Sequence, residues 1–172
     1  MSEFIADTVH KSIDRLPFGH LFDNMPILVP ARSTSLMKSN SLWVPLRILN
    51  ELQRRGLGRE VSACLERTYP LQKAATSTGG NRPTVAQQYD SQVVQKLIAD
   101  PESILLVDDV VTTGATLIGS AKRLKEAYPT ARISAFAALR TVSLPQNFKG
   151  INDPVFNQIT LYPSGKTHRE PD

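Results

Sequence analysis

The segment from Ile104 to Thr116 constrains the fold more than any other part of the sequence. It begins with the uninterrupted apolar run 104–107, continues with the adjacent carboxylates Asp108 and Asp109, and passes through a turn rich in Thr and Gly. Apolar residues in a row without alternation are typical of a parallel strand buried on both faces. Apolar residues at helical spacing follow, so we predict a buried strand that ends at the carboxylates, a short turn, and a helix.

The rest of the hydrophobic pattern predicts further strands and helices in alternation. We predict helices over 4–16 and 41–55, the second capped by Ser41 and ended by Gly56, and a helix in the second half of 88–99. We predict strands over 26–30, 61–65, 133–139 and 159–162, with Cys64 buried in the second of these strands. The polar tail from Ser164 is predicted to be mobile. Strand, helix and strand at this spacing form βαβ units, so the sheet should be mostly parallel.

The turn between the predicted strand and helix has the chemistry of a phosphate site. A helix N-terminus offers unpaired N–H groups and the positive end of the helix dipole. Gly114 permits a backbone shape that directs successive N–H groups at one anion, and Thr112, Thr113 and Thr116 add hydroxyl donors. The carboxylates before the turn suit sugar hydroxyls or Mg²⁺ with its water shell. A sugar phosphate therefore satisfies both halves of the segment.

Composition excludes several other classes of protein. A length of 172 residues fits one domain. The single cysteine excludes an intramolecular disulfide and a Cys-rich zinc site, and the three histidines form no ligand pair. No stretch reaches the roughly 18 apolar residues that a membrane span needs. The N-terminus lacks the features of a signal peptide, so we expect a cytoplasmic protein without a membrane partner.

The charge and the remaining motifs narrow the choice of ligand. A net charge of +4 suits an anion. The basic group Arg54, Arg55 and Arg59 is interpreted as a solvated helix end rather than a nucleic-acid stripe. No G-x-G-x-x-G follows a strand, and Ser120 stands where a P-loop requires lysine.

The twelve positions from Leu105 to Thr116, with the apolar Ile104 before them, resemble the ribose 5-phosphate signature of type I phosphoribosyltransferases: four apolar residues, two acidic residues, and a T-G-x-T loop. The resemblance implies an α/β fold with an open, mostly parallel twisted sheet and flanking helices. It implies a single domain over 1–172, with a core over about 26–140, a small hood from about 1–25 and 140–172, and a flexible lid over about 68–85. Homodimers are common in this family.

The resemblance also implies an activity, which is pentosyl transfer in nucleotide metabolism. Such a glycosyltransferase moves ribose 5-phosphate from Mg²⁺-bound phosphoribosyl pyrophosphate to a nucleobase or similar nitrogen acceptor and releases pyrophosphate. By similarity, Asp108 and Asp109 are the catalytic pair, which hold the ribose hydroxyls and contact Mg²⁺ indirectly, through water and substrate. The substrate-binding residues implied are Thr112, Thr113, Gly114, Ala115 and Thr116 at the 5-phosphate, Arg32 and Ser33 in the pyrophosphate turn, and Arg67, Lys73 and Arg82 as lid cations.

The acceptor and the subgroup stay open at this point. Thr112 stands where the 6-oxopurine enzymes have an aspartate, which disfavours a hypoxanthine or guanine acceptor. The signature is closer to the orotate enzymes and the ComF-like group, and the chain fits neither cleanly. The aromatic residues Phe18, Phe22, Phe148, Phe156 and Tyr162 are candidates for stacking on a base, although packing in a minor core is favoured for each. The alternative function is a non-catalytic regulator of the same fold, which binds phosphoribosyl pyrophosphate or a nucleotide, with or without a nucleic-acid partner.

Overall fold

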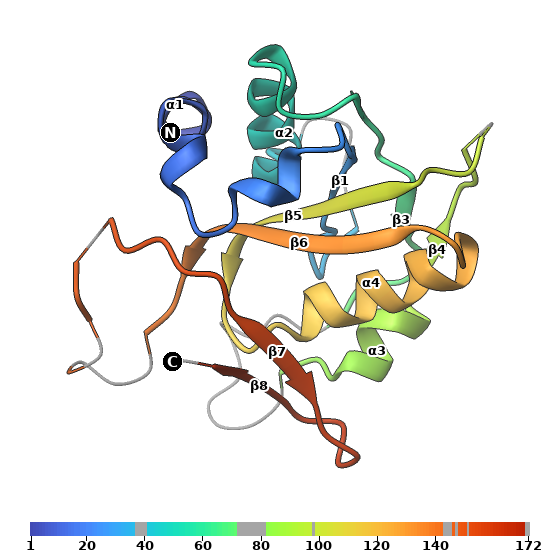
Figure 1. The fold of residues 1–172 in the computed structure, drawn as a ribbon. Helices are drawn as coiled ribbons and strands as arrows, with labels where there is room; N and C mark the ends of the chain where they lie inside the picture. Colours follow the sequence, from blue (N-terminus) through green and yellow to red (C-terminus); the bar gives the residue numbers. More distant parts are fainter. Residues whose placement is uncertain are drawn as a thin grey trace.

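The computed structural model describes residues 1–36, 41–71, 82–97, 99–142, 146, 148–150 and 152–170. Its centre is a four-stranded, all-parallel sheet in the order β2-β1-β5-β6 (Figure 1). These strands are β1 (Ile27–Pro30), β2 (Glu60–Val61), β5 (Ser103–Val111) and β6 (Arg132–Arg140). Helices lie on both faces of the sheet, which confirms the predicted α/β class with an open parallel sheet.

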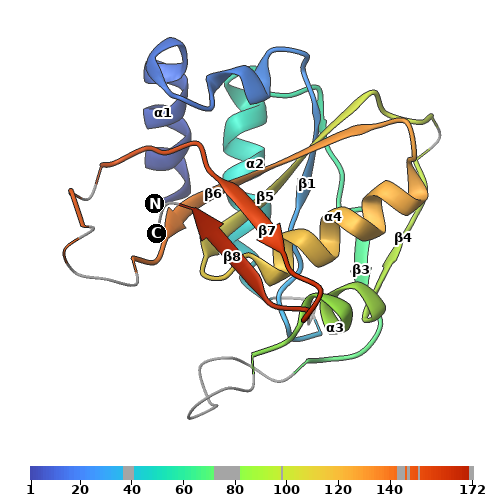
Figure 2. The ribbon, with the colours of Figure 1, turned by 60° about the horizontal axis from the view of Figure 1, so that its bottom comes forward.

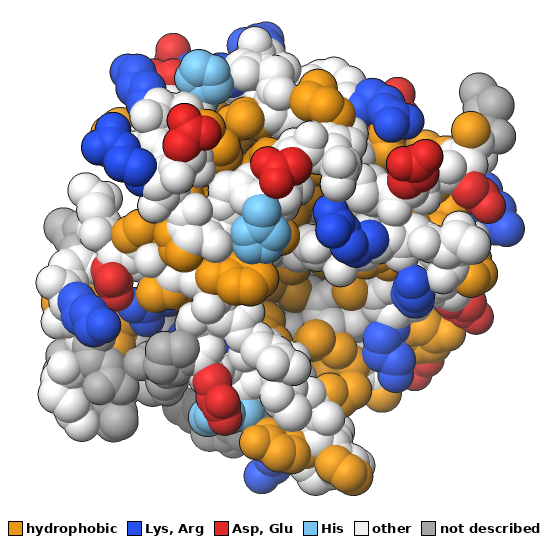
Figure 3. Space-filling view, in the orientation of Figure 1, with side chains coloured by type: hydrophobic (Ala, Val, Ile, Leu, Met, Phe, Trp, Pro, Cys, Tyr) orange, Lys and Arg blue, Asp and Glu red, His pale blue; other side chains and the backbone are white. Residues whose placement is uncertain are grey.

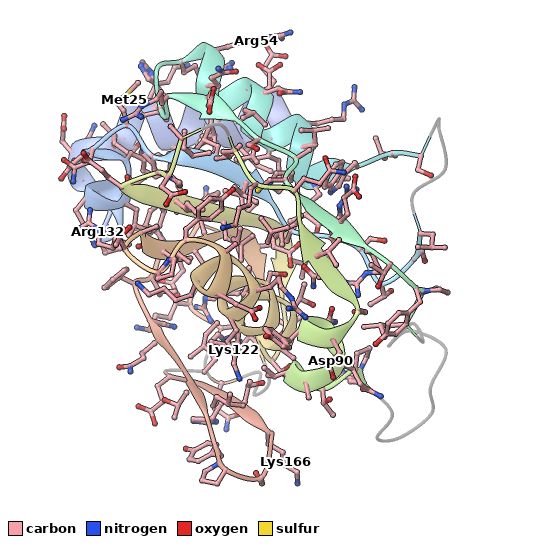
Figure 4. All side chains as sticks on the ribbon, turned by 90° about the vertical axis from the view of Figure 1, so that its right-hand side faces the viewer. Met25, Arg54, Asp90, Lys122, Arg132 and Lys166 are labelled. Atoms are coloured by element: carbon pink, nitrogen blue, oxygen red, sulfur yellow. The ribbon has the colours of Figure 1, made fainter. Side chains whose placement is uncertain are left out.

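The two faces of the sheet are covered by different helices. Helices α1 (Ser2–Ser12) and α2 (Val44–Arg54) cover one face, together with the short 3-10 helices η1 (Ile13–Arg15) and η2 (Gly19–Phe22). Helix α4 (Ala115–Ala127) covers the other face, and α3 (Val85–Asp90) packs against α4. Figure 4 labels Asp90 and Lys122 on these two adjacent helices.

Strand β5 supplies apolar side chains to both cores, as its unbroken run predicts. Ile104 and Leu106 pack in the core that contains residues of α4, whereas Leu105 and Val107 pack in the core that contains residues of α2. The register places Pro30, the last residue of β1, opposite Val107. The turn after β1 therefore leaves the sheet at the level of the two aspartates.

Two small antiparallel sheets complete the described fold. Strand β3 (Leu65–Arg67) pairs with β4 (Gln92–Val94), and β7 (Gln158–Leu161) pairs with β8 (Thr167–Glu170). The β7–β8 hairpin lies beside the first turn of α4 in both ribbon views (Figures 1 and 2). Lys166 marks the turn of this hairpin at its outer end (Figure 4).

Several sequence-based boundaries are wrong. Strand β5 continues through the aspartates to Val111, because β6 pairs with it along that length. The predicted strand 61–65 is instead two short strands, β2 and β3, and the buried Cys64 lies between them. Helix α2 starts at Val44 with Trp43 at its N-cap rather than Ser41, and the Trp43 indole donates to the carbonyl of Ala31 at 2.9 Å.

Two larger corrections concern α3 and the C-terminal tail. The helix predicted in the second half of 88–99 lies earlier, over α3, and strand β4 occupies 92–94 because it pairs with β3. The tail predicted to be mobile contains β8, whose Arg169 is buried. Within the described ranges, no helix is both long enough and apolar enough to cross a membrane.

Candidate active site

An open cleft of about 80 Å³ lies at the carboxyl end of β5. Its lining comes from the turn after β1, the segment leading into α3, α3 itself, the end of β5 and the first turn of α4 (Thr34, Arg82, Pro83, Gln88, Asp108 and residues 110–117). The carboxyl ends of strands in open parallel sheets are where ligands bind. The described residues thus form a space suited to one phosphate-sized group at the predicted position.

Asp108 is the carboxylate that lines the cleft. Burial raises its pKa from 3.8 to about 7, and hydrogen bonding to and repulsion from Asp109 add to the rise. Its Oδ1 accepts the backbone N–H of Asp109 at 3.0 Å. A carboxyl with this pKa changes charge near neutral pH, and a nearby cation would favour the ionised form.

Asp109 is not among the described residues that line the cleft. Its Oδ1 accepts the backbone N–H of Val110 at 3.0 Å. The structure therefore brings one of the two predicted catalytic carboxylates to the cleft and places the other directly beside it.

The predicted phosphate loop, residues 112–116, lines the cleft throughout. Gly114 is the N-cap of α4, and no side chain caps the helix there. Its φ of 83° lies in the left-handed region, which favours glycine. Thr112 and Thr113 are exposed, and Thr116 is half-buried in the first turn. An N-terminus without a side-chain cap, with the positive end of the helix dipole, and three threonines thus line the same cleft as Asp108.

The β7–β8 hairpin packs against this loop and donates hydrogen bonds beside it. The sequence did not predict these contacts. A Cβ added at Gly114 would lie 2.5 Å from Cδ1 of Ile159 in β7. The Arg169 guanidinium in β8 donates to the carbonyl of Val111 at 3.1 Å and to the carbonyl of Thr141. The shape of the loop therefore depends on packing from β7 and on hydrogen bonds from β8.

The turn after β1 brings Thr34 to the cleft, whereas Arg32 and Ser33 are held elsewhere. The Arg32 guanidinium stacks on Trp43 with 4.1 Å to the ring centroid, and its Nε donates to the carbonyl of Leu65. Burial lowers the pKa of Arg32. The Ser33 hydroxyl accepts the N–H of Ser35 at 3.1 Å. Neither predicted side chain lines the described cleft.

Arg67 is buried at the end of β3, with 8% of its surface exposed. Its guanidinium donates to the carbonyls of Arg32 and Ser33, to the Ser91 hydroxyl, and to the Gln88 amide oxygen at 2.9 Å. Each of these partners is neutral. Burial and the nearby Arg32 charge lower its pKa to about 10. Arg67 thus holds the turn after β1 in place and leaves the cleft to other groups.

The remaining predicted residues are divided between described and undescribed parts of the chain. Arg82 is exposed and lines the cleft. Lys73 and most of the predicted lid lie outside the described residues. Phe18 and Phe22 pack against Phe136, with ring centroids 5.5 and 6.2 Å apart. Phe148, Phe156 and Tyr162 are exposed.

Asp108 in the cleft and Asp109 directly beside it are the described groups that could hold Mg²⁺ together with a substrate. In the described part of the chain, no three His, Cys, Asp or Glu side chains gather as a complete metal site. The two adjacent carboxylates repel each other, and this repulsion contributes to the raised pKa of Asp108. Mg²⁺ is typically bound by one or two carboxylates plus water and substrate oxygens, which is what this pair offers.

Comparison with known proteins adds little evidence about the function of this chain. No family model and no curated protein matches the sequence. Among solved structures, the chain is similar to a hypoxanthine phosphoribosyltransferase from Staphylococcus aureus, with a TM-score of 0.42 and 12% sequence identity over 89% of this chain and 68% of that chain. A similarity at this level carries no argument about function, so the function must be argued from the cleft.

Proposed function

We propose that the chain is a phosphoribosyltransferase that takes ribose 5-phosphate from Mg²⁺-bound phosphoribosyl pyrophosphate to a nitrogen acceptor, with release of pyrophosphate. The observation that carries the proposal is that Asp108 and the uncapped N-terminus of α4 line the same cleft. The helix end and the threonine hydroxyls suit the 5-phosphate, and Asp108 suits a ribose hydroxyl.

The carboxylates also have a role toward the metal ion. Asp108 and Asp109 would hold Mg²⁺ through water and substrate oxygens, and the ion supplies charge that stabilises the departing pyrophosphate. Arg82 is the described cation best placed to help, since it lines the same cleft. Catalysis of this kind depends on positioning and charge stabilisation and needs no covalent nucleophile.

A second candidate function is a non-catalytic sensor of a phosphorylated ribose. It is favoured by the internal contacts of Arg32 and Arg67, which withdraw two cations from the cleft. A nucleic-acid partner for such a sensor has less support. On the face drawn in Figure 3, basic and acidic side chains of the described residues are interspersed rather than gathered in a stripe.

The test is pyrophosphate release from Mg²⁺-phosphoribosyl pyrophosphate across a panel of purine and pyrimidine bases, with Asp108→Asn protein as the control. Release with one base that is abolished in the control supports the enzyme and identifies its acceptor. Binding of phosphoribosyl pyrophosphate without release for any base supports the sensor. Absence of both binding and release refutes the proposed site.

A further inference from the structure

A chain of side-chain hydrogen bonds runs from the buried Arg67 through the buried Gln88 to Thr116 at the cleft. The Arg67 guanidinium donates to Oε1 of Gln88 at 2.9 Å, and Nε2 of Gln88 donates to the Thr116 hydroxyl oxygen at 3.2 Å. Gln88 is 2% exposed and projects from α3, and both Gln88 and Thr116 line the cleft. Two side-chain hydrogen bonds thus connect three elements that are distant in the sequence, β3, α3 and α4.

The chemistry of the first member fixes the direction of every hydrogen bond in the chain. Arginine has only donors, so the group of Gln88 that faces Arg67 must be the carbonyl oxygen. The amide nitrogen of Gln88 then faces Thr116 and occupies a lone pair of its hydroxyl oxygen. The hydroxyl hydrogen of Thr116 must therefore point away from Gln88.

We propose that Arg67 and Gln88 are positioning residues that keep the Thr116 hydroxyl oriented as a hydrogen-bond donor toward an anion in the cleft. This inference rests on the proposed function, because it assumes that the cleft binds a phosphorylated ribose. The proposal assigns a role in ligand binding to Arg67, which is buried among neutral hydrogen-bond partners and does not line the cleft itself.

The same guanidinium holds the opposite side of the cleft. Arg67 donates to the carbonyls of Arg32 and Ser33, in the turn whose next residue, Thr34, lines the cleft. Gln88 therefore connects the turn after β1 with the phosphate loop. Both sides of the proposed ligand are set by one rigid, buried network.

The first test reverses the hydrogen bond between residue 88 and Thr116 with a nearly isosteric change. In Gln88→Glu, the carboxylate still accepts from Arg67 but cannot donate to Thr116, whose hydroxyl hydrogen turns toward the carboxylate. The matched control is Gln87→Glu, which adds the same charge one residue away. Gln87 is exposed, and its Oε1 only accepts the N–H of Thr84 at 2.9 Å, a contact that glutamate preserves.

The measurement is the affinity for ribose 5-phosphate by calorimetry, with thermal unfolding of each variant as the check on folding. Loss of one charge-assisted hydrogen bond predicts about tenfold or more weaker binding for Gln88→Glu. The Gln87→Glu control should change affinity by less than about twofold, since its charge is screened. Gln88→Met, which removes the donor without adding charge, should weaken binding in the same direction and serves if the glutamate variant does not fold.

A double-mutant cycle separates the hydroxyl from the added charge. In the Thr116→Val background the hydroxyl is gone, so Gln88→Glu should cost clearly less affinity than in the natural protein. An equal cost in both backgrounds, or equal effects of Gln88→Glu and Gln87→Glu, overturns the positioning role while the proposed site stands. Failure of the natural protein to bind ribose 5-phosphate overturns the proposed function and this inference together.

Discussion

Replacing Asp108 with asparagine is expected to make the folded protein more stable at neutral and alkaline pH. The Asp108 carboxyl is largely buried, and burial raises its pKa from 3.8 to about 7. The folded state therefore binds the proton more tightly than the unfolded state, and the free energy of unfolding falls as pH rises from about 4 to 7. Asparagine cannot ionise, and its Oδ1 can still accept the N–H of Asp109. The free energy of unfolding of the variant should therefore not fall over this pH range on account of residue 108.

The size of the effect follows from the shift. About three pKa units at 1.36 kcal/mol per unit give about 4 kcal/mol at pH 8, and close to nothing at pH 4. In a chain of this length, 1 kcal/mol moves Tm by about 2–4 °C, so Tm should rise by about 10 °C at pH 8.

The assay is urea and thermal unfolding of both proteins without ligand, at several pH values between 4 and 8.5. Asp90→Asn, which removes an exposed carboxylate at the end of α3, is the matched control and should follow the natural protein at every pH. A stability difference for Asp108→Asn that does not grow with pH, or a variant less stable than the natural protein at pH 8, would refute the reasoning.

Three further predictions concern the phosphate loop and its ligand. Gly114→Ala should cost about 1–3 kcal/mol of stability, because alanine at a φ of 83° is strained and its Cβ would meet Ile159, and Ile159→Ala in the same chain should restore part of the loss in urea unfolding. Arg169→Met should weaken ribose 5-phosphate binding in calorimetry while far-ultraviolet circular dichroism stays unchanged, because β8 loses its hydrogen bonds to the Val111 and Thr141 carbonyls while the strands and helices remain. Binding of ribose 5-phosphate with Mg²⁺ should release a proton near pH 7, because the cation favours the ionised form of Asp108. The release would appear in calorimetry as a binding enthalpy that depends on the buffer. A buffer-independent enthalpy would contradict this prediction.

The central strand and the turn that leads from it into α4 were predictable because their signals are local. An unbroken apolar run, adjacent carboxylates and a Thr/Gly turn stand next to one another between Ile104 and Thr116, and the structure places the loop in a cleft. The start of α3 was also readable. Thr84 and Gln87 form a capping box, and their spacing in the sequence indicates a helix that starts at Val85.

The supporting residues could not be predicted, because their roles depend on contacts between distant segments. A basic sequence favours arginines as ligands of a phosphate, and Arg32 and Arg67 each follow or end a strand, where a substrate contact was expected. Where each guanidinium points is decided by Trp43 in one case and by Gln88 in the other. Arg169 lies in a polar stretch without hydrophobic periodicity, so no local pattern marks it as buried.

The contact between Arg169 and the Val111 carbonyl also bears on the order in which the protein folds. The Arg169 side chain and the Val111 carbonyl are 58 positions apart, so this contact carries a large loop-closure cost and should form late in folding. The parallel sheet can assemble before then, with the phosphate loop still free to sample other shapes. A nascent or nicked chain that lacks β8 would therefore have a native-like sheet and core but a poorly formed anion site.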